Sequence, residues 1–303
     1  MTDTVAKIYE KHIDDPLNHD GIGENELLAV SFGTSFNDSR AKDIGSIEKA
    51  LQKAFPEWSV RRAFTSGMII NHIYRRDGIK IDNPEEALER AVSNGVKHLL
   101  VQPTHLMHGT EYDDLIEDVE KFRDKFESVM IGEPLLGATG ADDDSLNEDK
   151  EAVARAITGE AVRDAGFESV AEAEAAGAAF VYMGHGTVHA AKITYTQMQA
   201  QMEKLGYRNV FVGTVDGEPE DTACEVIIEK VKAAGYKKVI LRPLMVVAGD
   251  HANNDMAGDD EDSWKSMFEA TKAFDSVECQ IIGLGATPAI QDIYVAHAKA
   301  VIE

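Results

Sequence analysis

The stretch AAFVYMGHGT, residues 178–187, is a short apolar run that ends in a histidine between two glycines. An apolar run of this length followed by glycine predicts a buried strand that ends in a loop. Ligands of parallel α/β sheets bind in the loops at the carboxyl ends of the strands. We therefore expect His185 to lie at a ligand site, with Gly184 and Gly186 leaving room for a flat or bulky ligand.

Strands alternate with helices along the part of the chain that precedes this stretch. Apolar runs predict strands at residues 27–32, 58–65, 98–102 and 128–131. The helices predicted between them include one that ends before Pro56, one that begins at Asn83, and one over residues 112–126. This alternation is typical of βαβ units and of a parallel sheet.

The second half of the chain repeats the order of the first half. The strand ends pair as GHGT (184–187) with FGT (32–34), Asp216-Gly217 with Ser66-Gly67, and GDH (249–251) with GTE (109–111). A long repeat in ordered segments indicates a duplicated structural unit. We predict an α/β protein of two similar domains, each with a four-stranded parallel sheet flanked by helices, with an active-site cleft between them.

Three segments set the predicted domain limits. The acidic stretch 138–151 interrupts the alternation, and we interpret it as a linker between an N-terminal domain (1–137) and a C-terminal domain (152–303). Residues 1–26 are polar and are predicted to form an appended arm. Thr287 and Pro288 are typical of a helix start. The helix predicted over 287–302 is expected to pack back on the first domain.

Composition excludes several classes of partner. The 30 basic and 54 acidic residues give a net charge of −24, which disfavours nucleic acid and anionic membrane as partners. With only Cys224 and Cys279, the chain has neither a disulfide framework nor a thiolate cluster. No signal peptide or membrane span is visible, so we expect a cytoplasmic protein. No phosphate-binding or dinucleotide motif is present, which predicts that no nucleotide is used.

Three strand ends of the second half carry groups able to bind a metal ion, namely His185, Asp216 and His251. The corresponding positions of the first half hold Phe32, Ser66 and Glu111. Two imidazoles and a carboxylate suit a divalent first-row ion and leave positions open for exchange. Taken singly, a histidine after a strand is commonly a hydrogen-bonded loop residue, and Asp-Gly is ordinary turn chemistry. The prediction therefore rests on the set, and it places the metal in the second half.

Other histidines lie near these positions in the sequence. His105 and His108 belong to the matching loop of the first half, and His189 follows His185 by four residues. We treat these three as candidates for contacts with the metal ligands or the substrate.

Several motifs together resemble one family. They are SFGTS (31–35), VQPTHLMHGTEYDDL (101–115), MGHGTVH (183–189), GTVDG (213–217) and RPLMVVAGDHANNDMAGDDEDSWK (242–265). The sequence from about Leu27 onward is similar to the anaerobic sirohydrochlorin cobaltochelatases of the class II chelatase superfamily. This resemblance implies a two-domain chelatase fold and insertion of Co²⁺ into sirohydrochlorin without ATP, on the route to cobalamin. It also implies that His185, Asp216 and His251 bind the metal.

One position departs from the family pattern. The family acid is generally glutamate, whereas this chain has Asp216, which is one methylene shorter. The shorter side chain would shift the ion or place a water between them. Glu218 lies close enough in the sequence to replace it, so the third ligand is left open between these two acids.

The implied chemistry assigns further roles. Insertion into a tetrapyrrole releases two pyrrole protons, and His185 is the candidate proton acceptor because a histidine titrates near neutrality. Glu111, expected across the cleft, is a candidate relay. The substrate carries many carboxylates, which backbone N–H groups of Gly33, Thr34 and Ser35 could bind, with Gly186 and Arg40 as further candidates.

Alternatives remain at this point. The same site would accept Fe²⁺ or Ni²⁺, because first-row ions compete for such ligands. A protein that only carries a tetrapyrrole or a metal would also use a two-domain cleft. A homo-oligomer and a separate haem site are left open.

Overall fold

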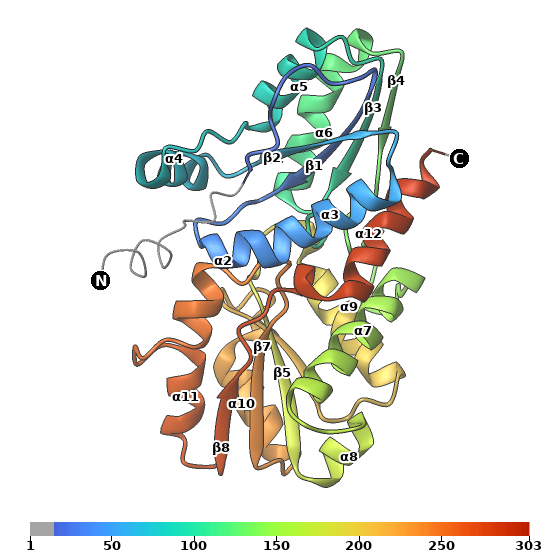
Figure 1. Ribbon diagram of the computed structural model, residues 1–303. Coiled ribbons are helices and arrows are strands. Elements are labelled where there is room, and N and C mark those ends of the chain that lie inside the picture. The colour runs from blue at the N-terminus through green and yellow to red at the C-terminus, as the bar shows by residue number, and fades with distance from the viewer. Residues whose placement is uncertain (1–14, 303) are drawn as a thin grey trace.

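The computed structural model describes residues 15–302, and these form two sheets that are each flanked by helices (Figure 1). The strands are β1 (Asn25–Ser31), β2 (Ser59–Phe64), β3 (His98–Pro103), β4 (Ser128–Ile131), β5 (Ala178–Gly184), β6 (Val210–Thr214), β7 (Lys238–Pro243) and β8 (Ser276–Cys279). The first sheet has the order β2-β1-β3-β4 and the second has the order β6-β5-β7-β8. All strand pairs are parallel. The predicted α/β architecture with two similar four-stranded sheets is confirmed.

Helices connect the strands within each half of the chain. Those of the first half are α2 (Asn37–Ser39), the π-helical turn η2 (Arg40–Ile44), α3 (Gly45–Ala54), α4 (Gly67–Asp77), α5 (Pro84–Ser93), α6 (Thr110–Phe122) and η3 (Arg123–Lys125). Those of the second half are α7 (Glu148–Asp164), α8 (Val170–Ala175), η4 (Ala190–Lys192), α9 (Ile193–Lys204), η5 (Glu220–Thr222), α10 (Cys224–Ala233), η6 (Ala252–Met256), α11 (Trp264–Ala270), η7 (Leu284–Ala286) and α12 (Pro288–Ala300).

The helix that begins after Asn83 forms for the predicted reason. The Asn83 side chain accepts a hydrogen bond from the Glu86 N–H, and the Glu86 carboxylate accepts one from the Asn83 N–H. This reciprocal capping, with Pro84 at the first helical position, satisfies N–H groups that the start of a helix leaves unpaired.

Helix α4 is not among the helices predicted from the sequence. Its apolar residues include Ile69, Ile70 and Ile73, and isoleucine favours strands over helices. Only Ile73 is fully buried, so the apolar positions do not form the wide stripe that identifies a helix on a core. The helix therefore presents most of its surface to solvent.

The segment 138–151, predicted as a linker, is partly helical. Helix α7 begins at Glu148, where the Asn147 side chain accepts a hydrogen bond from the Lys150 N–H at 2.8 Å. The buried Lys150 ammonium donates to the carbonyl oxygens of Leu136 and Ala138, which fixes the start of the segment. Burial lowers the Lys150 pKa to about 8. Of the predicted arm, residues 1–14 lie outside the described residues, and the division into two domains stays a prediction.

The last helix, α12, joins the two halves. It packs against α3 and β3 of the first half and against α7 of the second. The buried Tyr294 hydroxyl lies 3.0 Å from the carbonyl oxygen of Thr104 and 3.1 Å from that of His105. His297 Nε2 lies 2.9 Å from Asp149 Oδ1. The hydrophobic core around Tyr294 contains buried residues of both halves, such as Leu100 and Phe180.

A second connection lies near the carboxyl edges of the sheets. The Asp43 carboxylate accepts a hydrogen bond from the Ala248 N–H at 2.9 Å, and the Ser39 hydroxyl donates to the Ala248 carbonyl at 2.7 Å. These bonds join α2 and η2 to the loop that leads to His251. Burial raises the Asp43 pKa to about 6.

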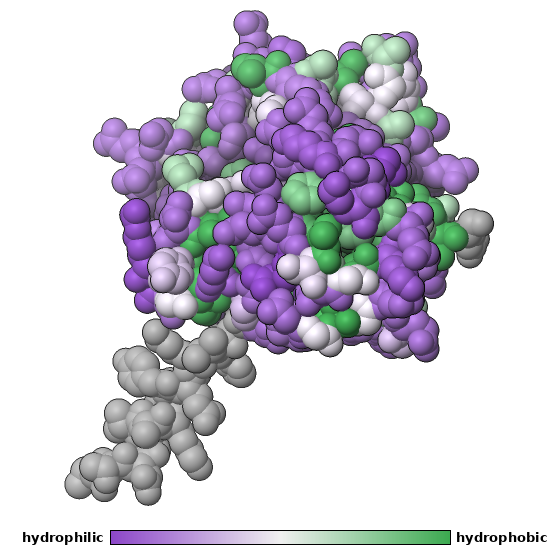
Figure 2. All heavy atoms as spheres, turned by 90° about the horizontal axis from the view of Figure 1, so that it is seen from above, coloured by the Kyte–Doolittle hydropathy of each residue, from purple (hydrophilic) through white to green (hydrophobic). Residues whose placement is uncertain are grey.

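The surface agrees with the acidic composition. Seen from above, the molecule is mainly hydrophilic, with apolar residues in small groups (Figure 2). Among residues 15–302, no helix has the length and apolar character that crossing a bilayer requires.

A buried acid on β1 makes stability depend on pH. Burial raises the Glu26 pKa from 4.5 to about 7, although Arg61 and Arg90 oppose the shift. Between pH 4.5 and about 7, folded Glu26 therefore keeps a proton that the unfolded chain releases. The free energy of unfolding falls as pH rises through this window, by at most about 1.4 kcal/mol per pH unit from this group. We expect Glu26→Gln to reduce that fall.

Urea unfolding at a series of pH values measures this dependence. Asp43 remains in the variant and contributes in the same direction up to about pH 6, so the slope should decrease without vanishing. Glu86→Gln, at a less buried position, is the matched control. An unchanged slope in Glu26→Gln would contradict the assignment.

Candidate metal centre

The three predicted metal ligands lie at the carboxyl edge of the second sheet. His185 directly follows β5, Asp216 follows β6, and His251 immediately precedes η6 in the connection after β7. The Val215 N–H donates to the Gly184 carbonyl and the Asp216 N–H to the His185 carbonyl, both at 2.9 Å. The parallel pairing thus continues beyond β5 and β6, and it brings His185 and Asp216 side by side.

The first half repeats these bonds without the metal-binding side chains. The Thr65 N–H donates to the Ser31 carbonyl, and the Ser66 N–H donates to the Phe32 carbonyl. Phe32 and Ser66 therefore occupy the places of His185 and Asp216. The fold is satisfied by phenylalanine and serine at these places, so it does not itself require the histidine and the acid.

The His185 ring is oriented by two acceptors. Its Nδ1 lies 2.9 Å from the Gly186 carbonyl oxygen and 3.3 Å from Asp216 Oδ2. Both partners accept hydrogen bonds, so the hydrogen is on Nδ1, and Nε2 keeps its lone pair. The side chain is half exposed, which leaves Nε2 available to a metal ion or a proton.

The His251 ring is held in a similar way. Its Nδ1 lies 2.5 Å from Asp255 Oδ2, on the next turn of the same helical segment. A carboxylate on one ring nitrogen fixes the tautomer and makes the other nitrogen a better ligand. The His185 and His251 rings are perpendicular, with centroids 4.4 Å apart. Two imidazoles with available Nε2 atoms are therefore in contact. Asp255 was not predicted, although its spacing of four residues from His251 was a usable signal.

The donor atoms of this group are not arranged around one point. Within residues 15–302, no three or more His, Cys, Asp or Glu side chains form a ready metal site. The reason is local, because Asp216 faces Nδ1 of His185 and not Nε2. In this geometry Asp216 orients His185, and ligation of one ion by both residues requires the imidazole to turn. The ligand set stays a prediction.

The alternative third ligand is engaged elsewhere. Glu218 Oε2 lies 3.0 Å from Lys192 Nζ. Asp216 contacts a predicted ligand directly, whereas Glu218 is neutralised by a lysine. This arrangement favours Asp216 as the acid of the site.

The two glycines beside His185 serve the protein's own packing. A Cβ at Gly184 would lie 2.3 Å from the Tyr195 ring. Gly186 has φ of +94°, and a Cβ there would lie 3.0 Å from the Asp216 Cβ. The Gly186 N–H donates to the Tyr195 hydroxyl at 3.2 Å. The space expected for a ligand at Gly184 is thus filled by the ring of Tyr195, which no sequence pattern placed there.

Comparison with known protein families shows which family the chain with His185, Asp216 and His251 belongs to. The family model described as cobalt chelatase (CbiK) matches residues 25–303. The chain belongs to the cobalt chelatase (CbiK) family.

Two relatives can be aligned with this chain over most of their length. The chain is 36% identical over 271 residues to the sirohydrochlorin cobaltochelatase of Salmonella typhimurium, covering 89% of this chain and 94% of the relative. It is 30% identical over 291 residues to the sirohydrochlorin cobaltochelatase CbiKC of Nitratidesulfovibrio vulgaris, covering 95% and 94%. The resemblance drawn from the sequence motifs is confirmed.

Solved chelatase structures share the fold. SirB from Bacillus subtilis with Fe³⁺ superposes with a TM-score of 0.62 at 14% identity, covering 92% of this chain and 96% of that one. The structure of CbiX, described as the terminal enzyme for biosynthesis of siroheme in denitrifying bacteria, gives a TM-score of 0.53 at 14% identity, covering 92% and 100%. The chelatase-like fold is confirmed.

In this chelatase-family chain, the turn after β1 faces the loop of His251. Gly33 has φ of +99°, and a Cβ there would lie 2.5 Å from the Phe64 ring. Thr34 is buried, and its Oγ1 would lie 3.3 Å from a Cβ at Gly249. Among the substrate-binding candidates of the first half, which are Gly33, Thr34 and Ser35, Thr34 therefore lies against the second half. Arg40 is buried and donates to the Thr34 carbonyl at 3.2 Å, so it supports this turn and is not available to a ligand.

Glu111 lies in the first turn of α6. This turn reaches the second half, since Asp113 Oδ2 lies 3.2 Å from His189 Nε2. The contact makes His189 a link between the halves, while the catalytic role of Glu111 stays a prediction.

The two candidate histidines of the first half, His105 and His108, have other environments. His108 Nε2 lies 2.6 Å from Glu133 Oε2. Both ring nitrogens of His105 are buried without a partner among the described residues, and burial lowers the His105 pKa to about 4. His105 is therefore neutral at physiological pH.

Asp216→Asn tests whether the carboxylate of Asp216 is needed for metal insertion. The change keeps the size and removes the charge that faces His185. We expect the rate of metal insertion to fall about 10- to 100-fold, the usual cost of losing a carboxylate that orients a metal-binding histidine. The measurement is the anaerobic insertion rate with Co²⁺ and sirohydrochlorin.

Glu218→Gln is the matched control and should remain close to the unmodified protein. A larger loss in Glu218→Gln than in Asp216→Asn would transfer the role to Glu218. Asp216→Glu, with unchanged rate and metal preference, would show that the shorter acid has no consequence.

Proposed function

We propose that the protein inserts Co²⁺ into sirohydrochlorin without ATP, in anaerobic cobalamin formation in the cytoplasm. One observation carries the proposal: two imidazoles with available Nε2 atoms and a carboxylate lie together at the carboxyl edge of one sheet. The membership in a cobalt chelatase family and the relatives named sirohydrochlorin cobaltochelatase support both substrates.

The reaction requires the exchange of an ion for protons. A divalent ion that enters a tetrapyrrole replaces the protons of two pyrrole nitrogens. Nε2 of His185 is the acceptor in the proposal, and Asp216 beside Nδ1 stabilises the resulting imidazolium. The same nitrogen cannot hold a metal ion and a proton together. His185 therefore releases Co²⁺ as it takes up the proton, which couples the two transfers.

His251 has the complementary role. Its hydrogen bond to Asp255 keeps the hydrogen on Nδ1, so Nε2 remains a metal ligand while His185 changes partner. The ion stays bound beside the ring until the pyrrole nitrogens replace the imidazoles. Glu111 is the proposed relay for the second proton.

The ligands of the site do not by themselves determine which metal ion is inserted. Imidazole and carboxylate ligands suit Fe²⁺ and Ni²⁺ as well as Co²⁺, and the affinity order of these ions alone does not select cobalt. The family description and the relatives favour Co²⁺.

The test is a comparison of insertion rates. The metal-free protein, sirohydrochlorin and Co²⁺ are mixed anaerobically, and the absorption spectrum of the tetrapyrrole is followed against the reaction without protein. We expect acceleration, and parallel reactions with Fe²⁺ and Ni²⁺ give the preference. Binding without acceleration by any of the three ions would make the protein a carrier and refute the enzyme.

A further inference from the structure

A hollow of about 760 Å³ lies beside the exposed face of α4. Its lining residues are Met68, Asn71, His72, Arg75 and Arg76. None of the predicted metal ligands belongs to this lining, so the hollow is a separate feature from the metal centre. Its volume is in the range of small-molecule sites.

The helix is positively charged in a protein that is strongly acidic. Residues 67–76 include Arg75 and Arg76 and no acid, and Asp77 is the last residue of the helix. Arg76 donates to Asp77 and to Asn37. Arg75 is exposed and makes no hydrogen bond or ion pair with another residue of the described range 15–302. One cation of the hollow is thus free for a ligand.

The same face carries an unusually exposed apolar side chain. Met68 is 83% exposed, although it lies in the first turn of α4, four residues after β2 ends at Phe64. Phe32 and Val188 are also exposed, and both lie within a few residues of strand ends, after β1 and β5. Three exposed apolar side chains therefore occur at carboxyl ends of the sheets, where the metal centre also lies.

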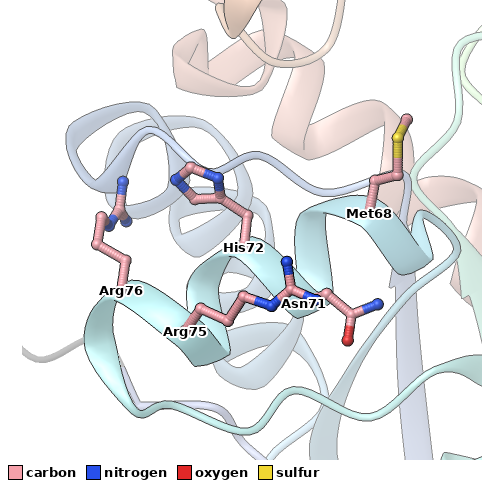
Figure 3. A pocket seen from close by; sticks show the side chains of 5 residues that line it. All are labelled: Met68, Asn71, His72, Arg75 and Arg76. Carbon is pink, nitrogen blue, oxygen red and sulfur yellow. The ribbon is translucent and has the colours of Figure 1, made fainter.

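One side of α4 faces the second half of the protein. Figure 3 shows Met68 and His72 extending to one side of the helix, and Met68 lies nearest a helical segment of the second half. Arg76 reaches Asn37 of α2 in the first half, and Arg75 extends along the helix toward Asn71. In Figure 1, α4 lies across from the orange segment that contains η6, which follows His251. The side of α4 that carries Met68 and His72 is therefore turned to the half of the protein that carries the metal ligands, and Arg75 lies on the adjoining side.

We infer that α4 binds the rim of the tetrapyrrole, with Arg75 pairing a peripheral carboxylate and Met68 contacting the macrocycle. The inference rests on the proposed function. The pyrrole nitrogens are at the centre of the ring, whereas the carboxylates of sirohydrochlorin are on its periphery. Residues that bind these carboxylates must therefore lie away from His185 and His251.

The spacing along α4 suits this division. Ser66, the N-cap of the helix, occupies in the first half the place of Asp216 in the second. Arg75 follows it by nine residues, which is about 13 Å along a helix axis. The helix thus leads from the strand edge outward, with an apolar residue near the edge and the arginines at its far end. A tetrapyrrole is likewise apolar over its flat ring and carries its charged carboxylates at the rim.

Arg75 supplies the sharpest test because its side chain has no partner within residues 15–302 that the substitution would remove. Arg75→Glu reverses the charge, and we expect it to weaken sirohydrochlorin binding at least about 10-fold, the size of one charge-assisted hydrogen bond. Binding is measured by titrating sirohydrochlorin in the absence of metal, and KM and kcat are measured with Co²⁺. The effect should appear in Kd and KM, with kcat nearly unchanged.

Arg208→Glu is the matched control. Arg208 is also exposed, and it precedes the amino end of β6, at the opposite edge of the sheet from the metal centre. Unchanged binding in Arg75→Glu, or an equal loss in Arg208→Glu, would overturn the inference. The unmodified protein separates the two proposals: absence of acceleration there would refute the chelatase function, while the metal-free titration would still decide the role of α4.

Discussion

Replacing His185 by alanine is expected to lower the rate of Co²⁺ insertion by about 10²- to 10⁴-fold, the range for loss of a general base. The variant loses the available Nε2 that accepts a proton, and Asp216 loses its imidazole partner. The substrate should still bind, because the rim contacts that we propose lie on α4. Single-turnover insertion at saturating sirohydrochlorin isolates this step from binding.

His98→Ala is the control for this experiment. His98 is also a histidine of a parallel strand, but it lies at the amino end of β3, where Nδ1 contacts the Ser128 hydroxyl at 2.8 Å. We expect its insertion rate to equal that of the unmodified protein. Full activity of His185→Ala would remove His185 from the mechanism, and with it the coupling of metal release to proton uptake.

Replacing His251 by alanine is expected to abolish insertion by removing the ion before the reaction. The ring that Asp255 orients is lost, and His185 remains as the only imidazole of the pair. Co²⁺ titration of the protein without tetrapyrrole should show the loss directly. Asp255→Asn keeps the ring and removes the orienting charge, so we expect an intermediate loss of about 10- to 100-fold in Co²⁺ affinity.

Asp259→Asn provides the comparison for Asp255→Asn. Asp259 belongs to the same acidic segment, and its side chain is fully exposed. It should leave Co²⁺ affinity unchanged. Equal losses in both variants would mean that the general negative charge, and not the contact with His251, determines the affinity. Normal Co²⁺ binding by His251→Ala would contradict its assignment as a ligand.

The fold was predictable because its signals are local and repeated. Buried parallel strands such as β5 are continuous apolar runs, and the residue pattern at Asn83 and Pro84 specifies a helix start. The duplication supported the remaining assignments, because each strand end predicted in one half has a counterpart at the matching position of the other half. Helix α4 was not predicted, because most of it is exposed and its isoleucines do not form an apolar stripe with helical spacing.

The site was predictable in its residues but not in its orientation. Parallel strand ends must meet at one edge, so the proximity of His185 and Asp216 follows from topology. Which imidazole nitrogen faces Asp216 depends on a side-chain torsion that no sequence pattern encodes. The packing of Tyr195 against Gly184 is a contact between β5 and the helix after η4, and it too depends on the assembled fold.

The bonds across Ala248 and the burial of Tyr294 determine how the protein can move during turnover. A hydrophobic core shared by both halves and hydrogen bonds from η2 and α12 oppose a hinge motion, because opening would expose apolar surface and unpaired polar groups. We therefore expect the spacing of the two halves to be nearly the same in the free and the substrate-bound protein. A flat substrate would then meet a surface that is already formed before it binds.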